Sequence, residues 1–361
     1  MRRILGDEGI ALPTTIFVVT LVTIMISALF VRVQADRRIG ESSGHNVDAL
    51  TIAQSGLETY LGGVTFDACD RPLRPPDGDS VRINVTGGYA DVVARVLRRP
   101  VDSLATWMYV VRSTGRTIVP TLGSDPQAQR TVAQFAEWQS STVTPPAAFT
   151  AANGLLRTSG GGLEFRGEDQ APSGCKEPDV HALRLPAGTD PTPRADFVMD
   201  GALPHIDQSG SNGQVAFETG IDWAVTIGGG LVPDTNAIVL WDMSYPVMLV
   251  PGNATLTTSS SQGFGTLIVT GDLSIQGDWL NWYGIVLVGG EIAFDAGQQL
   301  FDGFVMSGLN EQLGTAVPMG EIGTVTKIDI DYDSRYVRLA LQAFAGFAPV
   351  SNAWIDNWAT Y

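Results

Sequence analysis

One uncharged and mostly apolar run, residues 10–31, constrains the fold of this chain more than any other feature. About 20 such residues, rising ~1.5 Å each in a helix, cross the ~30 Å hydrocarbon core of a bilayer. A secretory signal peptide has a shorter apolar core followed by a small-residue cleavage site, and residues 30–34, FVRVQ, offer none. The sequence therefore predicts a transmembrane helix at 10–33. An ordinary signal anchor is the alternative.

A glycine, Gly9, stands directly before this run and behind a short charged leader. This arrangement resembles the prepilin leader of type IV pilins and type II secretion pseudopilins. The resemblance implies that a prepilin peptidase cuts between Gly9 and Ile10 and methylates the new amine of Ile10. Gly6 is the rival position, but cutting there would leave the charges of Asp7 and Glu8 at the head of a segment that must stay in hydrocarbon.

The fifth residue after the expected cut is Thr14. Most major pilins carry a glutamate there, which neutralises the terminal amine of the neighbouring subunit. The resemblance therefore implies a minor subunit, similar to K-type pseudopilins and PilX-type minor pilins, that sits at the end of a filament.

An amphipathic helix is expected to extend the membrane segment to residue 65, because apolar residues recur at intervals of three and four. These residues are Val47, Leu50, Ala53, Leu57 and Leu61. Gly40 and Gly44 predict a break near residues 40–45. Residues 53–61, AQSGLETYL, resemble the A-x-x-G-L-E motif that closes the N-terminal helix of PilX-type minor pilins.

The remainder of the 361-residue chain is expected to be mainly β, because it is rich in turn formers, with 41 glycines and 20 prolines, and has only 17% charged residues. A net charge of −16 argues against binding nucleic acid, because phosphate backbones would be repelled. Arg2 and Arg3 favour a cytoplasmic start, while Arg32, Arg37 and Arg38 weaken that signal. The prepilin resemblance places the head outside the cytoplasm, anchored in the inner membrane, or on a pilus or the cell surface.

Two cysteines occur, Cys69 and Cys175. In an oxidising compartment they predict one disulfide, worth roughly 4 kcal/mol through the long loop that it closes. Two separate buried thiols are the alternative. No histidine or cysteine lies near either at the spacing of a metal site.

A repeat forms the strongest pattern after the leader. Four glycine-bounded apolar segments begin at residues 246, 265, 284 and 303, and a second short strand follows each of the first three. A fixed period of this length predicts a short parallel β-helix, or solenoid, with glycines at its corners. A first strand pair at 154–158 and 163–167 would start the solenoid before an insertion at about 168–235. An antiparallel meander of hairpins is the alternative.

Acidic residues of the repeat raise the question of glycoside hydrolysis. Asp272, Asp278, Glu291 and Asp295 would supply paired carboxylates, but Asp272 and Glu291 hold equivalent positions after a turn, where a structural role is the better interpretation. The three histidines have no serine or cysteine signature that predicts a nucleophilic triad. The aromatic residues Trp279, Trp282 and Tyr283 would support sugar binding if exposed in a groove, whereas stacking inside the repeat is their commoner role.

Asp329, Asp331 and Asp333 alternate with apolar residues and form a weak calcium candidate, but the spacing fails as an EF-hand. An amphipathic strand with a solvated acidic face is the favoured interpretation. Residues 332–334, YDS, and the helical pattern after them resemble the end of PilX-type minor pilins and are expected to cap the solenoid.

Together these features predict a pilin-like transmembrane helix and a mainly β head. The expected function is non-enzymatic: joining a type IV pilus or a secretion pseudopilus to prime assembly or to form the tip, with other pilins, the assembly machinery and prepilin peptidase as partners and no cofactor. A membrane-anchored β-helix polysaccharide-degrading enzyme, or an anchored adhesin or carbohydrate-binding protein, is the alternative. The predicted segments are a leader at 1–9, a transmembrane helix at 10–33, an amphipathic helix at 34–65, a pilin-like β region at 66–145, the start of the solenoid with its insertion at 146–235, nineteen-residue rungs at 236–310, and a C-terminal strand and capping helix at 311–361.

Overall fold

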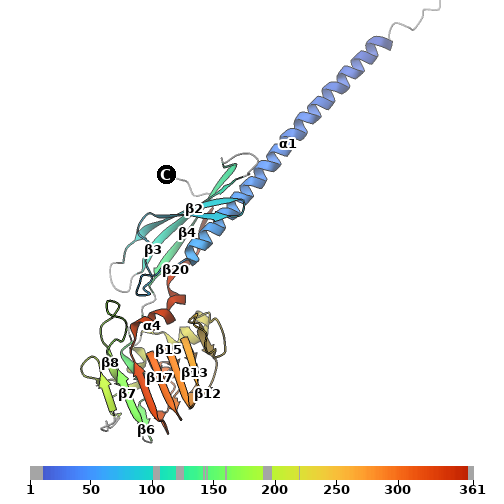
Figure 1. Ribbon diagram of the computed structural model, residues 1–361. Coiled ribbons are helices and arrows are strands. Elements are labelled where there is room, and N and C mark those ends of the chain that lie inside the picture. Colours follow the sequence, from blue (N-terminus) through green and yellow to red (C-terminus); the bar gives the residue numbers. More distant parts are fainter. Residues whose placement is uncertain are drawn as a thin grey trace, which may run out of the picture. The chain divides into compact units, whose positions relative to one another are not determined.

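The computed structural model describes residues 11–100, 106–118, 126–140, 143, 145–158, 161–189, 197–218 and 220–356 (Figure 1). The chain forms two compact units. The first comprises Met1–Gly63, Pro75–Trp138 and Phe347–Tyr361, and the second comprises Val64–Arg74 and Gln139–Gly346. The ranges 66–145 and 311–361, each expected to be one region, are therefore both divided between the units.

A single helix, α1 (Ala11–Gly62), dominates the first unit (Figure 1). It is long and apolar enough to cross a membrane, and every side chain from Thr15 to Gly44 is exposed. The predicted break near residues 40–45 is wrong, because α1 runs through both glycines. Each mid-helix glycine costs only about 1 kcal/mol, and i,i+4 contacts such as the Arg37–Glu41 ion pair at 2.9 Å lie in the same stretch.

The C-terminal half of α1 packs against an antiparallel sheet. Its strand order is β1 (Asp79–Val85), β2 (Gly88–Arg98), β3 (Trp107–Thr117), β4 (Ala128–Gln139) and β20 (Gly346–Asp356). Local composition predicts a strand at residues 107–112 and a turn at residues 113–115. The strand is confirmed, but the turn is wrong. These residues continue β3 and pair with β2 on one side and β4 on the other.

The second unit contains a ten-stranded sheet and a five-stranded sheet. The path of the larger sheet is β10 (Ile206–Gln208), β8 (His181–Leu185), β5 (Ala147–Ala151), β17 (Gln298–Ser307), β15 (Trp279–Val288), β13 (Ser261–Val269) and β11 (Val247–Val250), and β19 (Lys327–Asp331), β7 (Gly162–Arg166) and β9 (Phe197–Asp200) extend from β17. The order of the smaller sheet is β12 (Ala254–Thr258), β14 (Leu273–Gly277), β16 (Ile292–Phe294), β18 (Gly320–Ile322) and β6 (Leu155–Arg157). Short helical segments complete the unit: α2 (Asn212–Phe217), α3 (Trp223–Val225), η3 (Thr226–Gly230), η4 (Leu309–Leu313), α4 (Ser334–Ala340) and η5 (Gln342–Phe344).

The strands of the repeat pair in parallel, and the register follows the period seen in the sequence. Val247 pairs with Thr266, Thr266 with Ile285, and Ile285 with Phe304. In the smaller sheet, Ala254 pairs with Leu273, and Leu273 with Ile292. The antiparallel alternative is therefore wrong for these strands, and their apolar side chains lie in one buried cluster that extends over the second unit.

Glycine is required at one repeated position, occupied by Gly265, Gly284 and Gly303. Their φ angles are +93°, +135° and +141°, a region that side chains disfavour. A Cβ added to Gly284 would overlap the Gly265 carbonyl, and one added to Gly303 would overlap the Gly284 carbonyl. The glycines therefore let successive strands bend at the same place and stack at sheet spacing.

Candidate functional site

The contact between α1 and its sheet uses small residues on both sides. Ala49 and Ala53 are fully buried, and a Cβ added to Gly115 of β3 would overlap the backbone of both alanines. One turn further along, a Cβ added to Gly56 would overlap the Ala90 methyl group of β2. The helix and the sheet therefore approach more closely than larger side chains would allow.

The A-x-x-G-L-E stretch supplies residues of this contact between α1 and the sheet. Ala53 and Gly56 face the sheet, and Leu57 is buried beside them, whereas Glu58 is exposed. Near the end of α1, the Tyr60 hydroxyl donates a 2.6 Å hydrogen bond to Asp79, and its ring lies 5.8 Å from that of Phe347. The motif thus fixes the last turns of the helix on β2 and β3.

The predicted processing site cannot be placed, because Gly9 and Ile10 lie outside the described residues. Thr14 lies within α1. The predicted disulfide, by contrast, is confirmed: Cys69 and Cys175 are bonded, with 5.2 Å between their Cα atoms.

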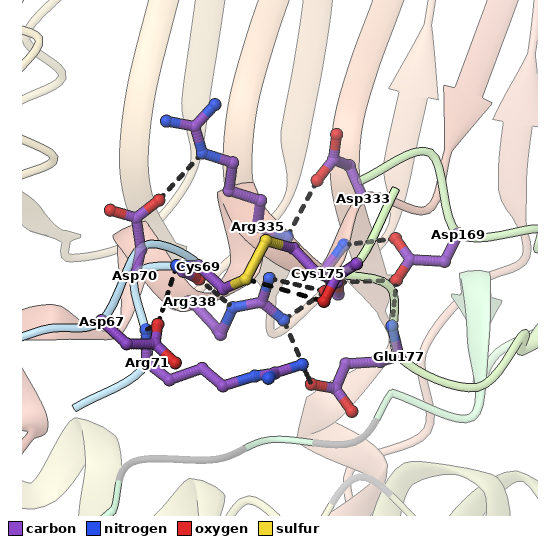
Figure 2. Close-up of a disulfide and its surroundings, with 12 residues drawn as sticks. Asp67, Cys69, Asp70, Arg71, Asp169, Cys175, Glu177, Asp333, Arg335 and Arg338 are labelled. Carbon is purple, nitrogen blue, oxygen red and sulfur yellow. Dashed lines mark hydrogen bonds and ion pairs between the residues drawn. A yellow bond between two sulfur atoms is a disulfide. The ribbon is translucent and has the colours of Figure 1, made fainter. Parts of the chain in front are cut away.

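Arg338 of α4 joins both segments that carry the disulfide (Figure 2). Its guanidinium donates to the Cys69 carbonyl at 2.9 Å and to the Cys175 carbonyl at 3.0 Å, and it pairs with Glu177 at 3.3 Å. Two more ion pairs hold the segment that carries Cys69 in place: Arg335–Asp70 at 2.8 Å and Arg71–Glu177 at 2.9 Å. Nothing in the sequence indicated these partners, since Arg335 and Asp70 are 265 residues apart.

Asp169 is a second centre of the same cluster (Figure 2). It is fully buried and accepts hydrogen bonds from the Ser334 hydroxyl at 2.6 Å, from the Ser334 N–H at 2.9 Å and from the Ala171 N–H at 3.0 Å. Asp333 caps α4 by accepting from the Arg335 N–H at 2.8 Å, and Tyr332 is buried. Residues 332–334, YDS, and the start of α4 are therefore joined by one group of hydrogen bonds, which we call the YDS junction.

The calcium candidate separates into different roles. Asp329 pairs with Lys327 at 2.9 Å and with Arg166 at 3.4 Å, and Asp331 pairs with Arg166 at 3.0 Å, while Asp333 caps α4. Across the described ranges, no group of three or more acidic, histidine or cysteine side chains could hold a metal. The favoured interpretation, a solvated acidic face, is wrong, because Asp329 is buried and its cationic partners come from β7 and from its own strand.

Asp302 lies beside this network on β17, in register with Tyr283 on one side and Asp331 on the other. Burial and the neighbouring carboxylates of Asp331, Asp333 and Asp329 raise the pKa of Asp302 to about 7. Burial and Asp329 also raise the pKa of Asp331 to about 6, against the opposing effect of Arg166.

The carboxylates of the repeat take part in a ladder of hydrogen bonds between its successive units. Asn253 accepts a hydrogen bond from the Asp272 N–H at 2.9 Å, and Asp272 in turn accepts one from the Glu291 N–H at 3.0 Å. Asp295 accepts from the Ser274 hydroxyl at 2.8 Å. Burial and the charges of Asp272, Glu321 and Asp295 raise the pKa of Glu291. The equivalent positions therefore connect each turn of the repeat to the next.

The aromatic residues of the repeat are not alike. Trp282 is buried and donates its indole N–H to the Gly265 carbonyl at 3.3 Å. Tyr283 is half-buried and stacks on Phe264, with 5.1 Å between the ring centres, and also lies 4.9 Å from Tyr336 of α4. Tyr283 therefore has a structural role through stacking on other rings of the head, and Trp282 has one as a buried core side chain.

An apolar cavity of about 220 Å³ lies against β13, β15 and β17, closed in part by residues 221–231. Its lining is apolar except for Thr226 and Thr266. Both hydroxyls already donate hydrogen bonds, Thr226 to the Asp222 carbonyl at 2.8 Å and Thr266 to the Ala340 carbonyl at 2.9 Å. The cavity therefore suits an apolar group and has no side chain placed for acid–base or nucleophilic chemistry.

Comparison of the chain with protein-family models, curated proteins and solved structures gives no match.

Proposed function

We propose that this protein is a minor pilin or pseudopilin, a non-enzymatic subunit that joins a type IV pilus or a secretion-like filament to prime assembly or form the tip. The observation that carries the proposal is the construction of α1. Its first half is apolar and exposed, and its second half is fixed on an antiparallel sheet through Ala53 and Gly56. One helix thus offers both a membrane anchor and a rigid support for a globular head.

Two other features support the same proposal. The glycine before the apolar run suits cleavage at Gly9–Ile10 by a prepilin peptidase, because glycine gives a protease a flexible chain. The YDS junction at residues 332–334 holds α4 against the disulfide loop, which keeps the head of a filament subunit stable outside the cytoplasm.

The finer architecture of the head belongs to the proposal as well. The nineteen-residue registers of both sheets, the stacked glycines and the Asn253–Asp272–Glu291 ladder support a short parallel β-helix. In this proposal α4 caps it, and the β-helix is the part that the filament presents.

The test is the mature N-terminus of the full chain, produced together with an active prepilin peptidase and extracted from membranes. We expect mass spectrometry to find a chain that begins with methylated Ile10. A Gly9→Val variant should keep its leader, whereas Gly6→Val, the matched control, should still be processed. A wild-type chain that retains Met1 under these conditions would contradict the assignment.

A further inference from the structure

The first strand of the smaller parallel sheet, β12, has an open edge. The strand order of that sheet begins at β12, which pairs with β14 alone. The Ala254 N–H donates to the Asp272 carbonyl at 2.8 Å, on the β14 side. Because peptide groups alternate along a strand, those of Thr255 and Thr257 point away from β14. In the described part of the chain no strand or loop pairs with them.

Two other edges of these sheets, at β11 and at β6, are protected. β11 belongs to the same nineteen-residue unit as β12. On β11, Val247 donates its N–H to the Asp234 carboxylate at 2.8 Å, and Leu249 donates to the Thr235 carbonyl at 3.0 Å. At the far end of the smaller sheet, β6 has only three residues and carries Arg157. Short strands and charged side chains are the usual means of blocking an edge. β12 has neither.

The chain segment that contains β11 and β12 also has no charged residue of its own. No charged residue occurs at positions 243–271, although 17% of the residues in the whole chain are charged. Thr255 and Thr257 are exposed, and Met243, at the start of the uncharged stretch, is 74% exposed. An uncharged edge with unpaired peptide groups is a template for another strand.

We propose that a second copy of this chain occupies this edge, with the two β12 strands pairing antiparallel about a twofold axis. Identical strands related by a twofold axis run antiparallel, and each supplies the donors and acceptors that the other lacks. In the register centred on Leu256, the outward peptide groups of Thr255 face those of Thr257 in the second copy.

Charge favours a second copy at this place over other faces. Each chain carries a net charge of −16, so two copies repel one another over most of their surfaces. The edge of β12 lies in the uncharged segment 243–271, so pairing there brings no like charges of the two paired strands together. This inference does not depend on the filament assignment, since it concerns only the β-rich second unit.

Cross-linking of the full chain in detergent or native membranes tests the proposal. Both native cysteines are in the disulfide, so Thr257→Cys introduces a single free thiol among the described residues. A bis-maleimide with a spacer of two carbons should link two Thr257→Cys chains. The matched control is Gln276→Cys, which is also exposed and is the partner of Thr257 in register on β14, one strand further from the edge. We expect at least tenfold less cross-linked dimer for the control.

Sedimentation of the full chain in detergent gives an independent readout. The wild-type chain should be dimeric at tens of micromolar. Thr257→Lys should be monomeric, because a charged side chain at each edge blocks strand pairing and the two lysines, diagonal across the twofold axis, repel one another. Gln276→Lys should remain dimeric. A monomeric wild-type chain, equal cross-linking of the two cysteine variants, or cross-linking of Thr257→Cys to a different protein would overturn the proposal.

Discussion

At the scale of single residues, Gly56 offers the sharpest test of the contact between α1 and its sheet. Gly56→Ala should destabilise the first unit by about 1–3 kcal/mol, because the new methyl group overlaps that of Ala90. Gly44→Ala is the matched control on the same helix, where a Cβ meets nothing within 4 Å. We expect hydrogen exchange of the β2 and β3 amides to accelerate in the first variant only. Equal exchange in both variants would show that the close approach is unimportant.

Asp302 gives a prediction of pH dependence. Its folded-state pKa, about 7, lies above the ordinary value of 3.8, so the native chain binds the proton more tightly than the unfolded chain. Stability is therefore lost as the pH rises from about 4 to about 7. Asp302→Asn removes this loss and should stabilise the second unit at pH 8 by up to about 4 kcal/mol, with little effect at pH 4. Urea unfolding at the two pH values measures the difference, and an equal gain at both would contradict it.

The sequence indicated positions but not their roles. Gly56 and Asp333 both lie in stretches that resemble PilX-type minor pilins, but the close approach of Gly56 to Ala90 and the N-cap at Asp333 come from the structure. The solvated acidic face predicted for residues 329–333 is wrong because Arg166, which pairs with Asp329 and Asp331, is about 165 residues away along the chain. Such long-range ion pairs leave no periodic signal in a single sequence.

At the scale of elements, α4 carries two arginines whose contributions should differ. Arg338 is 90% buried and donates to both cysteine carbonyls, whereas Arg335 is 44% exposed and pairs only with Asp70 among the described residues. Arg338→Met should cost about 2–3 kcal/mol of unfolding free energy, because two part-buried carbonyls and Glu177 lose their donor. Arg335→Met should cost less than about 1 kcal/mol.

Urea unfolding of the full chain, with the disulfide verified by non-reducing peptide mapping, distinguishes the two arginine variants. Equal losses would mean that α4 is held by packing alone and that Arg338 has no special role. Two free thiols in the wild-type chain from its native compartment would remove the basis of the comparison.

The elements also show why some predictions succeed. Four apolar segments at one spacing were enough to predict parallel strands in the correct register, because stacking is the arrangement that buries every repeat in the same way. The predicted break in α1 and the predicted turn at residues 113–115 are wrong because a glycine does not by itself end a helix or a strand. In β3, Gly115 is instead the place where Ala49 and Ala53 of α1 come closest to the sheet.

At the scale of the whole molecule, the division into units was beyond the reach of sequence patterns. The last strand, β20, returns to the first unit and pairs with β4, while Val64–Arg74 joins the second unit through the disulfide. Linear segmentation assigns neighbouring residues to the same unit, but here the chain crosses between the units near residues 64, 75, 139 and 347. Only contacts between distant segments reveal such crossings.

Thr14 links the whole molecule to its proposed place in a filament. In a homopolymer, each N-terminal amine buried among apolar helices requires a carboxylate partner, and an unpaired buried charge costs several kcal/mol. Thr14 offers only a hydroxyl, so the processed chain should be unable to form a filament alone, although its Ile10 amine can pair with a glutamate of another subunit. Thr14→Glu should increase incorporation along the shaft, with Thr14→Ser as the matched control that leaves incorporation unchanged.

Deletion of the protein should reduce the number of filaments more than their length, because a subunit confined to the end acts once per filament. Electron microscopy of sheared filaments, with quantitative immunodetection of the subunit, measures both quantities. Long homopolymers of the purified wild-type chain, or an unchanged filament number after deletion, would contradict a minor-subunit role. A β12-mediated dimer would persist in either case, because its edge lies in the second unit and does not involve α1.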